Sequence, residues 1–398
     1  MKLRADADKL AEAVSYTAKA LPGRAAFPVL LGMMLTTTST GLHLAASDTE
    51  VYTTATVTAE IADDGRALVP GRLLADICAR LPKTAQVDIE LDDASGRLTL
   101  ACGTARFNLP TLPADEYPAL PSLPDAVATT GAEDFATAVA QVAVAVGTED
   151  ALPAMTGIEM SLDGTDLILA ATDRYRIGRR ALTVRPTGTL PTVPAKKRRG
   201  KADDGTGTAP ETEGARILIP GKTLADAARA LSGDHTLTLH WSEGLFALSL
   251  PGGRSYMTRL LTGYTFPSLD KMFAADRPLA VTVQAADAAT AVQRVALVAA
   301  RNTAVRLHIT DGELAVDAGH GDDAHASDRI PANVTGDLGL PLTIAFNPAY
   351  LLDALKAPGT PEVRIEIAHP HQPARLVGRT DEIDETYQHL LMPVRLNT

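Results

Sequence analysis

The chain has 398 residues, of which 45% are hydrophobic and 21% are charged, and its formal net charge is −11 at pH 7. That length suits two to four domains with separate cores. The negative charge excludes a uniformly basic nucleic-acid binder but not a local basic surface. No apolar run is long enough to cross a membrane and no basic-then-apolar leader is present, so we expect a cytoplasmic protein. Cys78 and Cys102 are too few for a disulfide framework and are expected to be core thiols.

The first elements in chain order are an apolar helix and a group of strands. The helix is predicted over Ala7 to Ala20, and the strands over Val29 to Thr38, Leu42 to Ala46 and Val51 to Ala59. A second helix, Gly71 to Leu81, precedes three more strands. Strands adjacent in sequence favour antiparallel pairing, with the helices on one face of the sheets. The predicted fold class is therefore strand-rich α+β.

This pattern is repeated along the chain. Asp6 to Asp48 aligns with Gly131 to Asp173 without a gap, and Val69 to Asp76 matches Ile219 to Asp226 at a larger separation. The second copy must therefore carry an insertion, which falls at about residues 186–215. That stretch is rich in Gly, Pro and Thr and cannot bury a core, so we predict a flexible loop.

A third, weaker copy follows. Ala286 to Ala300 repeats the first helix, and Phe346 to Asp353 takes the place of the second helix start. The predicted domains are 1–124, 125–271 with the insertion, and 272–398. The architecture is thus three similar domains in tandem.

Two motifs resemble catalytic sites. Gly221-Lys222-Thr223 is similar to the end of a phosphate-binding loop, but the first glycine that such a loop needs is missing at the required spacing, so a helix start is predicted. Asp48 and Asp173 occupy equivalent positions in different copies and are interpreted as turn residues rather than as a catalytic pair. We expect no enzyme, and a nucleotide-binding hydrolase that uses Asp173 and Lys222 is the remote alternative.

Four histidines are the candidate metal ligands. His320, His325, His369 and His371 lie on polar segments without cysteine or a helical i, i+4 spacing. Neither a metal nor a cofactor is therefore expected.

Basic side chains recur on equivalent predicted helices of this acidic chain. They are either ordinary solvated positions or parts of a surface for nucleic acid. The same two interpretations apply to the basic run Lys196 to Lys201 in the insertion. The helical residues are Arg72, Arg80, Lys83, Lys222, Arg229, Arg294, Arg301 and Lys356.

Several motifs occur in the order found in one known family. They are Leu21-Pro22-Gly23-Arg24, Asp76 to Pro82, Phe107 to Pro118, Ala171 to Ile177, Phe266-Pro267 and Leu390 to Leu396. Together with the repeat, they resemble the bacterial DNA polymerase III beta subunit, the sliding clamp, over essentially the whole chain. The resemblance implies the DNA clamp fold and a head-to-tail homodimer. Six similar domains would form a ring around duplex DNA, with helices inside and antiparallel sheets outside.

The resemblance also implies a function and its partners. A processivity factor without catalysis would tether the replicative DNA polymerase, the clamp loader and repair proteins to double-stranded DNA through short linear motifs. A ring holds DNA by topology, so its contacts can be weak, sequence-independent and salt-sensitive. Arg24 would contact DNA, and a DNA-facing role is favoured for the helical cations named above. The alternative is a specialised second, inhibitor-resistant clamp with an altered partner pocket.

Two sets of site residues follow from the resemblance. The subunit contact would join Ile77 and Phe107 to Leu297 and Val298. In the peptide pocket, apolar side chains would receive Leu or Phe, and Arg176 and Asn347 would bind the backbone or polar side chains of the peptide. Arg174-Tyr175, where many members have Gly-His, and Lys271-Met272 depart from the family pattern at its rim. The pocket residues are Met155, Thr172, Tyr175, Arg176, Ile177, Pro267, Met272, Asn347, Tyr350, Leu390, Met392, Pro393, Val394 and Arg395.

Overall fold

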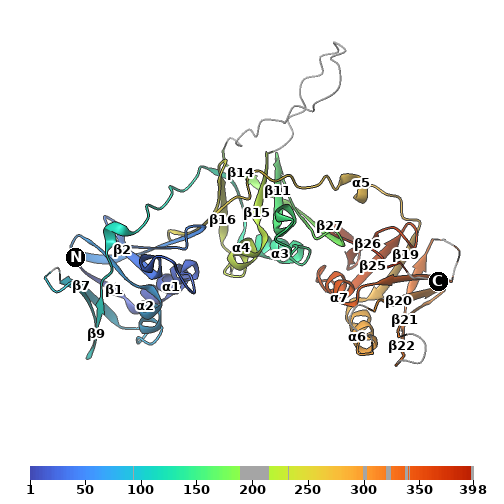
Figure 1. Ribbon diagram of the computed structural model, residues 1–398, viewed down its shortest axis with the longest axis horizontal. Helices are drawn as coiled ribbons and strands as arrows, with labels where there is room; N and C mark the ends of the chain where they lie inside the picture. The colour runs from blue at the N-terminus through green and yellow to red at the C-terminus, as the bar shows by residue number, and fades with distance from the viewer. Residues whose placement is uncertain are drawn as a thin grey trace, which may run out of the picture. The chain divides into compact units, whose positions relative to one another are not determined.

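The computed structural model describes residues 1–92, 94–188, 215–231, 233–298, 303–319, 324–336, 339 and 341–395. Figure 1 labels their helices and strands and colours them by residue number. By their contacts, these residues form two compact units. The first unit holds Met1–Glu133, a short stretch from Arg185, and Ala230–Leu260. The second holds Asp134–Val184, the segment that ends at Arg229, and the chain from Leu261 onward. The basic run Lys196 to Lys201, Arg301 and His320 lie outside the described residues.

The first unit is built from antiparallel strands with two helices from the first copy. A five-stranded sheet has the order β5-β1-β7-β8-β9, and a nine-stranded sheet has the order β14-β10-β16-β17-β18-β4-β3-β2-β6. The helices are α1 (Ala7–Thr17) and α2 (Gly71–Cys78). The strands are β1 (Lys2–Asp6), β2 (Gly32–Thr38), β3 (Gly41–Ser47), β4 (Val51–Val57), β5 (Ala59–Asp63), β6 (Arg66–Pro70), β7 (Gln86–Asp92), β8 (Arg97–Cys102), β9 (Ala105–Pro110), β10 (Ala126–Gly131), β14 (Arg185–Pro186), β16 (Thr236–Trp241), β17 (Leu245–Leu250) and β18 (Arg254–Arg259).

The predicted elements of the first copy are largely confirmed, with differences at their ends. The first α-helix ends at Thr17, and Ala18–Ala20 form a 3₁₀ turn. The strand predicted to Ala59 ends at Val57. Val29 to Leu31 was predicted as strand but belongs to a 3₁₀ turn, η2 (Pro28–Leu31), because Pro28 fixes the backbone angle that begins a helical turn. The second helix ends at Cys78 rather than Leu81, since the residue before Pro82 is disfavoured in the α conformation.

One apolar face of α1 packs into the core of the first unit. Leu10 and Val14 are fully buried and lie four residues apart on the same face of the helix. They belong to one apolar cluster with side chains of β3, such as Leu42 and Leu44. Burying a leucine or valine contributes about 1.5–3 kcal/mol each, so this face keeps the helix on the sheet.

The second unit is also antiparallel. A nine-stranded sheet has the order β15-β11-β12-β13-β27-β26-β25-β19-β23, and a four-stranded sheet has the order β22-β21-β20-β24. The helices are α3 (Ala132–Ala143, which begins just before the unit), α4 (Gly221–Ala228), α5 (Asp270–Phe273), α6 (Ala285–Ala296) and α7 (Pro348–Lys356). The strands are β11 (Gly157–Asp163), β12 (Asp166–Thr172), β13 (Arg176–Thr183), β15 (Ala215–Pro220), β19 (Leu279–Gln284), β20 (Val305–Thr310), β21 (Glu313–Ala318), β22 (Ala326–Pro331), β23 (Asn333–Thr335), β24 (Leu342–Phe346), β25 (Glu362–Ile367), β26 (Ala374–Arg379) and β27 (Ile383–Leu391).

The Pro-Gly motifs start helices, as predicted. Helix α4 begins at Gly221, directly after Pro220. A Cβ atom at Gly221 would lie 2.7 Å from the side chain of Val146 and 2.9 Å from the Thr156 carbonyl oxygen. Close packing therefore explains the glycine at this position without a bound phosphate. The resemblance to a phosphate-binding loop no longer supports the hydrolase alternative.

Within the described ranges, no helix is both long and apolar enough to span a membrane.

Candidate functional site

The turn between β12 and β13 is held by its own side chains. The Asp173 carboxylate (Oδ1) accepts hydrogen bonds from the backbone nitrogens of Tyr175 and Arg176, both at 3.0 Å. The Thr172 hydroxyl accepts from the Arg174 nitrogen at 3.2 Å and donates to the Arg176 carbonyl at 2.8 Å. Arg174 has a left-handed backbone, φ +80°. The interpretation of Asp173 as a turn residue is confirmed.

Arg176 joins this turn to helix α7. Its side chain is only 12% exposed and donates to Asp173 Oδ2 at 2.9 Å and to Asp353 Oδ2 at 2.5 Å. Its guanidinium carbon lies 4.3 Å from the centre of the Tyr350 ring. Charge-assisted hydrogen bonds of this kind are strong when partly buried. These internal partners give Arg176 the role of positioning the turn and Tyr350.

Tyr175 and Tyr350 stack on each other, with Arg174 against the first ring and Arg176 against the second. Their rings are stacked with centres 6.2 Å apart and planes 27° apart. Arg174 lies 5.8 Å from the Tyr175 ring centre and pairs with Glu149 at 2.9 Å. Burial, with the nearby Asp173 charge, raises the pKa of Tyr350. Tyr175 is 52% exposed and so presents a rigid aromatic wall to solvent.

An apolar cluster lies beside this wall. Ile177 of β13 and Leu390 of β27 are opposite each other in the sheet, and both pack with Phe273 of α5. Half-buried Leu269 and Met272 complete the cluster. The guanidinium of Arg179 lies 5.2 Å from the centre of the Phe273 ring. Sequence reasoning missed Leu269 and Phe273, although their i, i+4 spacing after Pro267 was the available signal.

The end of the chain borders the same region. Met392 donates its backbone N–H to the Tyr175 carbonyl at 2.8 Å, and Val394 donates to the Ala345 carbonyl at 2.7 Å. Met392 and Val394 are exposed, as is Arg395, whereas Pro393 is half-buried. Apolar side chains in water next to an apolar cluster are typical of a binding surface.

The remaining predicted pocket residues have local partners. Asn347 caps helix α7, and its Oδ1 accepts from the nitrogens of Ala349 and Tyr350 at 2.9 and 3.2 Å. Met155 is half-buried, and its carbonyl accepts from Gly147 at 2.8 Å. Pro267 is half-buried next to the buried Phe266. The contacts that the structure describes connect these members of the predicted set: Thr172, Tyr175, Arg176, Ile177, Met272, Tyr350, Leu390 and Met392.

A buried polar pair lies on the strand that carries Leu390. The Tyr387 hydroxyl donates to the Gln141 carbonyl at 3.0 Å, so His389 Nδ1, at 2.8 Å, must be the donor to that hydroxyl. Burial, helped by the Arg176 charge, lowers the pKa of His389 to about 3. His389 is therefore a neutral structural group.

Those predicted DNA-facing cations that the structure describes are at the surface. Three have exposed acidic neighbours: Arg80 with Asp76, Lys83 with Asp8 and Arg229 with Asp226. Arg294 pairs with the half-buried Asp328. Exposed pairs of this kind contribute about 0–1 kcal/mol, so a phosphate can replace the acidic partner at little cost. Arg72 donates to the carbonyls of Leu21 and Pro22. Arg24, Lys222 and Lys356 are also exposed.

The predicted subunit-contact residues lie at sheet edges and helix ends. Phe107 is half-buried on β9, an edge strand of the five-stranded sheet, and Ile77 is half-buried on α2. In the second unit, Leu297 is 86% exposed at the end of α6, and Val298 follows it. Strand β22 is one of the two edge strands of the four-stranded sheet. Edge strands and exposed leucines are features that a subunit contact would cover.

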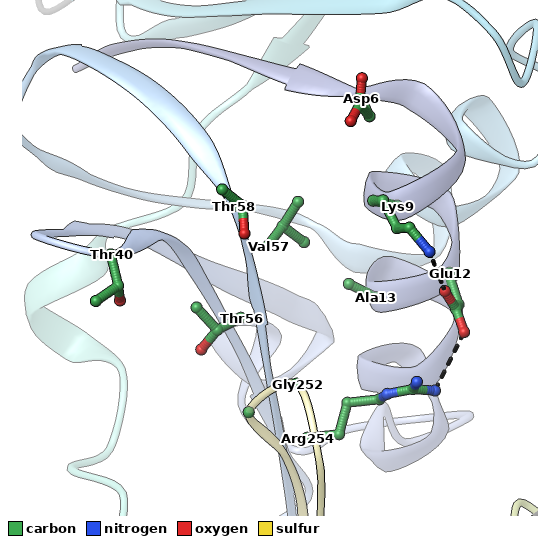
Figure 2. Close-up of a pocket in the computed structure, with 11 residues that line it drawn as sticks. Asp6, Lys9, Glu12, Ala13, Thr40, Thr56, Val57, Thr58, Gly252 and Arg254 are labelled. Atoms are coloured by element: carbon green, nitrogen blue, oxygen red, sulfur yellow. Dashed lines mark ion pairs between the residues drawn. The ribbon is translucent and has the colours of Figure 1, made fainter.

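A polar cavity of about 640 Å³ lies within the first unit, between α1 and the β17–β18 turn (Figure 2). Glu12 bridges it by pairing with Arg254 at 3.3 Å and with Lys9 at 3.9 Å. The cavity contains none of the predicted site residues. Over the part of the chain that the structure describes, no group of three His, Cys, Asp or Glu side chains is placed to hold a metal ion.

Solved structures with this architecture are bacterial sliding clamps. The Bacillus subtilis clamp has a TM-score of 0.84 at 24% identity and covers 100% of this chain and 99% of its own. A Pseudomonas aeruginosa clamp bound to griselimycin has a TM-score of 0.85 at 23% identity, with both chains fully covered. The C. crescentus beta sliding clamp, described with PEG bound to a proposed beta-motif tethering region, has a TM-score of 0.83 at 23% identity, and covers 100% of this chain and 99% of its own. The fold is therefore the clamp fold.

Sequence comparison identifies the family. Models of the DNA polymerase III beta subunit match residues 1–121 (N-terminal domain), 130–198 (central domain) and 271–395 (C-terminal domain). The beta sliding clamp of Streptomyces coelicolor is 41% identical and the beta sliding clamp homolog GriR of Streptomyces muensis is 34% identical, each with full coverage of both chains. The chain belongs to the DNA polymerase III beta subunit family, the beta sliding clamps.

Proposed function

We propose that this sliding clamp acts as a processivity factor without catalytic activity of its own. Two chains, joined head to tail, would encircle double-stranded DNA in the cytoplasm. Short linear motifs of the replicative polymerase, the clamp loader and repair proteins would bind the surface around Tyr175, Ile177 and Met392. The chain would provide three clamp domains, 1–124, 125–271 and 272–398.

The observation that carries the peptide-binding part is the apolar surface of the second unit. A cluster of Ile177, Leu390 and Met272 lies beside an exposed Tyr175 wall and an exposed Met392. Leucine or phenylalanine side chains of a peptide can cover this surface, and methionines adapt to varied partners. The griselimycin-bound and tethering-region clamps of similar fold support this assignment.

The DNA-binding and dimer parts are supported by charge and by sheet edges. The exposed Arg24, Arg72 and Lys222 suit weak contacts with phosphates, which a sliding ring requires. The edge strands β9 and β22 offer unpaired backbone groups for strand-to-strand contact between subunits. Leu297, with 86% of its surface exposed, would be covered there.

Removal of the tail tests the peptide assignment. A chain that ends at Leu391 loses Met392 and the hydrogen bond to the Tyr175 carbonyl, so it should lose peptide binding yet remain a dimer. We would measure fluorescence anisotropy with a labelled pentapeptide that carries two leucines and a final phenylalanine, and mass by light scattering. Full binding by the truncated dimer would contradict the assignment.

A specialised second clamp is the alternative, and the stack of Arg174 and Tyr175 favours it. These two residues replace a common Gly-His pair and reshape the wall beside Ile177. A clamp with the ordinary client range should bind the same pentapeptide at micromolar strength. Failure to bind it, with binding of a motif from another client, would favour the specialised clamp.

A further inference from the structure

At two places a strand of one repeat pairs with a strand from a later part of the chain, and the two pairings have the same register. We call them the first junction (β4 with β18) and the second junction (β13 with β27). In the first junction, β4 pairs with β18 so that Tyr52 lies opposite Met257. In the second junction, β13 pairs with β27 so that Ile177 lies opposite Leu390. The Glu50 carbonyl accepts from the Arg259 nitrogen at 3.0 Å, as the Tyr175 carbonyl accepts from Met392 at 2.8 Å.

The turns before the two junctions also match. Asp48 Oδ1 accepts from the nitrogens of Glu50 and Val51 at 3.0 and 2.7 Å, as Asp173 does in the second junction. The Ser47 hydroxyl accepts from the Thr49 nitrogen at 2.9 Å. Thr49 has φ +84°, close to the +80° of Arg174. The backbone that presents the peptide surface is therefore built twice.

An apolar cluster is repeated as well. Tyr52 and Met257 pack with Ala247, and half-buried Leu120 lies against them. Leu120 follows Tyr117-Pro118 in the chain as Leu269 follows Phe266-Pro267, so the same segment after each copy completes each cluster.

Several equivalent positions differ in side-chain chemistry, and three of them matter for the entry of a peptide. Tyr52 takes the position that Ile177 has in the second junction. Its hydroxyl donates a hydrogen bond to the Thr49 carbonyl at 2.5 Å, so the side chain is directed toward the turn. Glu50 and Arg259 replace Tyr175 and Met392. They are exposed and paired at 3.9 Å, and Arg259 also donates to the Thr49 carbonyl at 3.2 Å.

We propose that the first junction is a second peptide site of the same design, closed by Tyr52 and by the Glu50–Arg259 pair. These three residues limit each chain to one bound peptide. The phenol ring occupies the position that an entering leucine would need, and overpacking is unfavourable. An apolar peptide bound there would also cover the charged groups of Glu50 and Arg259 and remove the water that solvates them, which is unfavourable. This inference rests on the proposed peptide-binding function of the second junction.

Transplanting the three side chains tests the inference. The triple variant Glu50→Tyr, Tyr52→Ile, Arg259→Met should bind two labelled pentapeptides per chain by isothermal titration, against one for the wild type. Trp241, the single tryptophan, lies in the first unit, so its unfolding transition shows that this unit is still folded. A folded triple variant that binds one peptide would overturn the inference, whereas a wild type that binds none would overturn the proposed function.

Two further variants locate the new site. The reverse exchange in the second junction, Tyr175→Glu, Ile177→Tyr, Met392→Arg, should lower the affinity for the peptide at least tenfold when made alone. A protein that carries this exchange together with Glu50→Tyr, Tyr52→Ile and Arg259→Met should again bind one peptide, at the first junction. The control Lys2→Met, Glu90→Tyr removes another exposed pair of the first unit, 3.4 Å apart, and should still bind one peptide. A second peptide on that control would show non-specific adhesion and contradict the inference.

Discussion

The turn after β3 and the turn after β12 have nearly the same backbone but different consequences for the molecule. At both turns an aspartate accepts two backbone hydrogen bonds, and a residue other than glycine adopts a positive φ. After the first turn comes Val51, an ordinary strand residue. After the second comes Arg176, which ties the strand to Asp353 and Tyr350 of α7. The repeated residues build the same turn in both copies, and the unrepeated ones give the second copy the surface that we propose binds peptides.

Removal of the two aspartates should destabilise the protein to different extents. Asp173→Ala loses two backbone hydrogen bonds and also leaves the 12% exposed Arg176 without one of its two carboxylates, so we expect a loss of about 3 kcal/mol. Asp48→Ala loses only the backbone bonds, at about 1–2 kcal/mol. Urea unfolding followed by circular dichroism measures both, and equal losses would mean that Arg176 does not anchor the second turn.

Low pH should destabilise the protein through the second junction but not through the first. His389 is neutral in the folded protein, and its pKa, lowered to about 3 by burial, lies below the usual value of about 6.5 in the unfolded chain. Between these values the unfolded state binds the extra proton, so stability falls by about 1.4 kcal/mol for each pH unit as the pH decreases. The equivalent position of the first junction holds Tyr256, which gains no charge in acid.

Replacement of this histidine checks the pH effect. His389→Gln should flatten the dependence of unfolding free energy on pH below 6.5, whereas the exposed His371→Gln should leave it as in the wild type. If the slopes of wild type and His389→Gln coincided, His389 would not be the buried neutral group described above.

The smallest effect concerns the left-handed residues themselves. Thr49→Gly relieves a β-branched residue at φ +84° and should stabilise the first unit by about 0.5–1 kcal/mol. Arg174→Gly relieves the same strain but loses the Glu149 pair and the contact with the Tyr175 ring, so its net change should be near zero. Thermal unfolding compares the two, and a destabilised Thr49→Gly would refute the strain argument.

Sequence alone predicted what repetition and local chemistry determine. The tandem copies, the Pro-Gly helix starts and the aspartate turns were predicted because they depend on neighbours along the chain. The Asp353–Arg176 pair and the place of Phe273 were not, because they join segments far apart in sequence through the fold. The resemblance indicated the pocket residues, but only the structure assigns Asn347 to a helix cap and Arg176 to a positioning role.

Retention on closed DNA tests the central claim, that this clamp works by topology. After loading on a circular duplex, the dimer should stay bound in high salt, because salt screens charge contacts but cannot open a ring. It should leave as soon as a single enzymatic cut makes the circle linear. Release by salt alone from the closed circle, or retention on the linear product, would contradict the account.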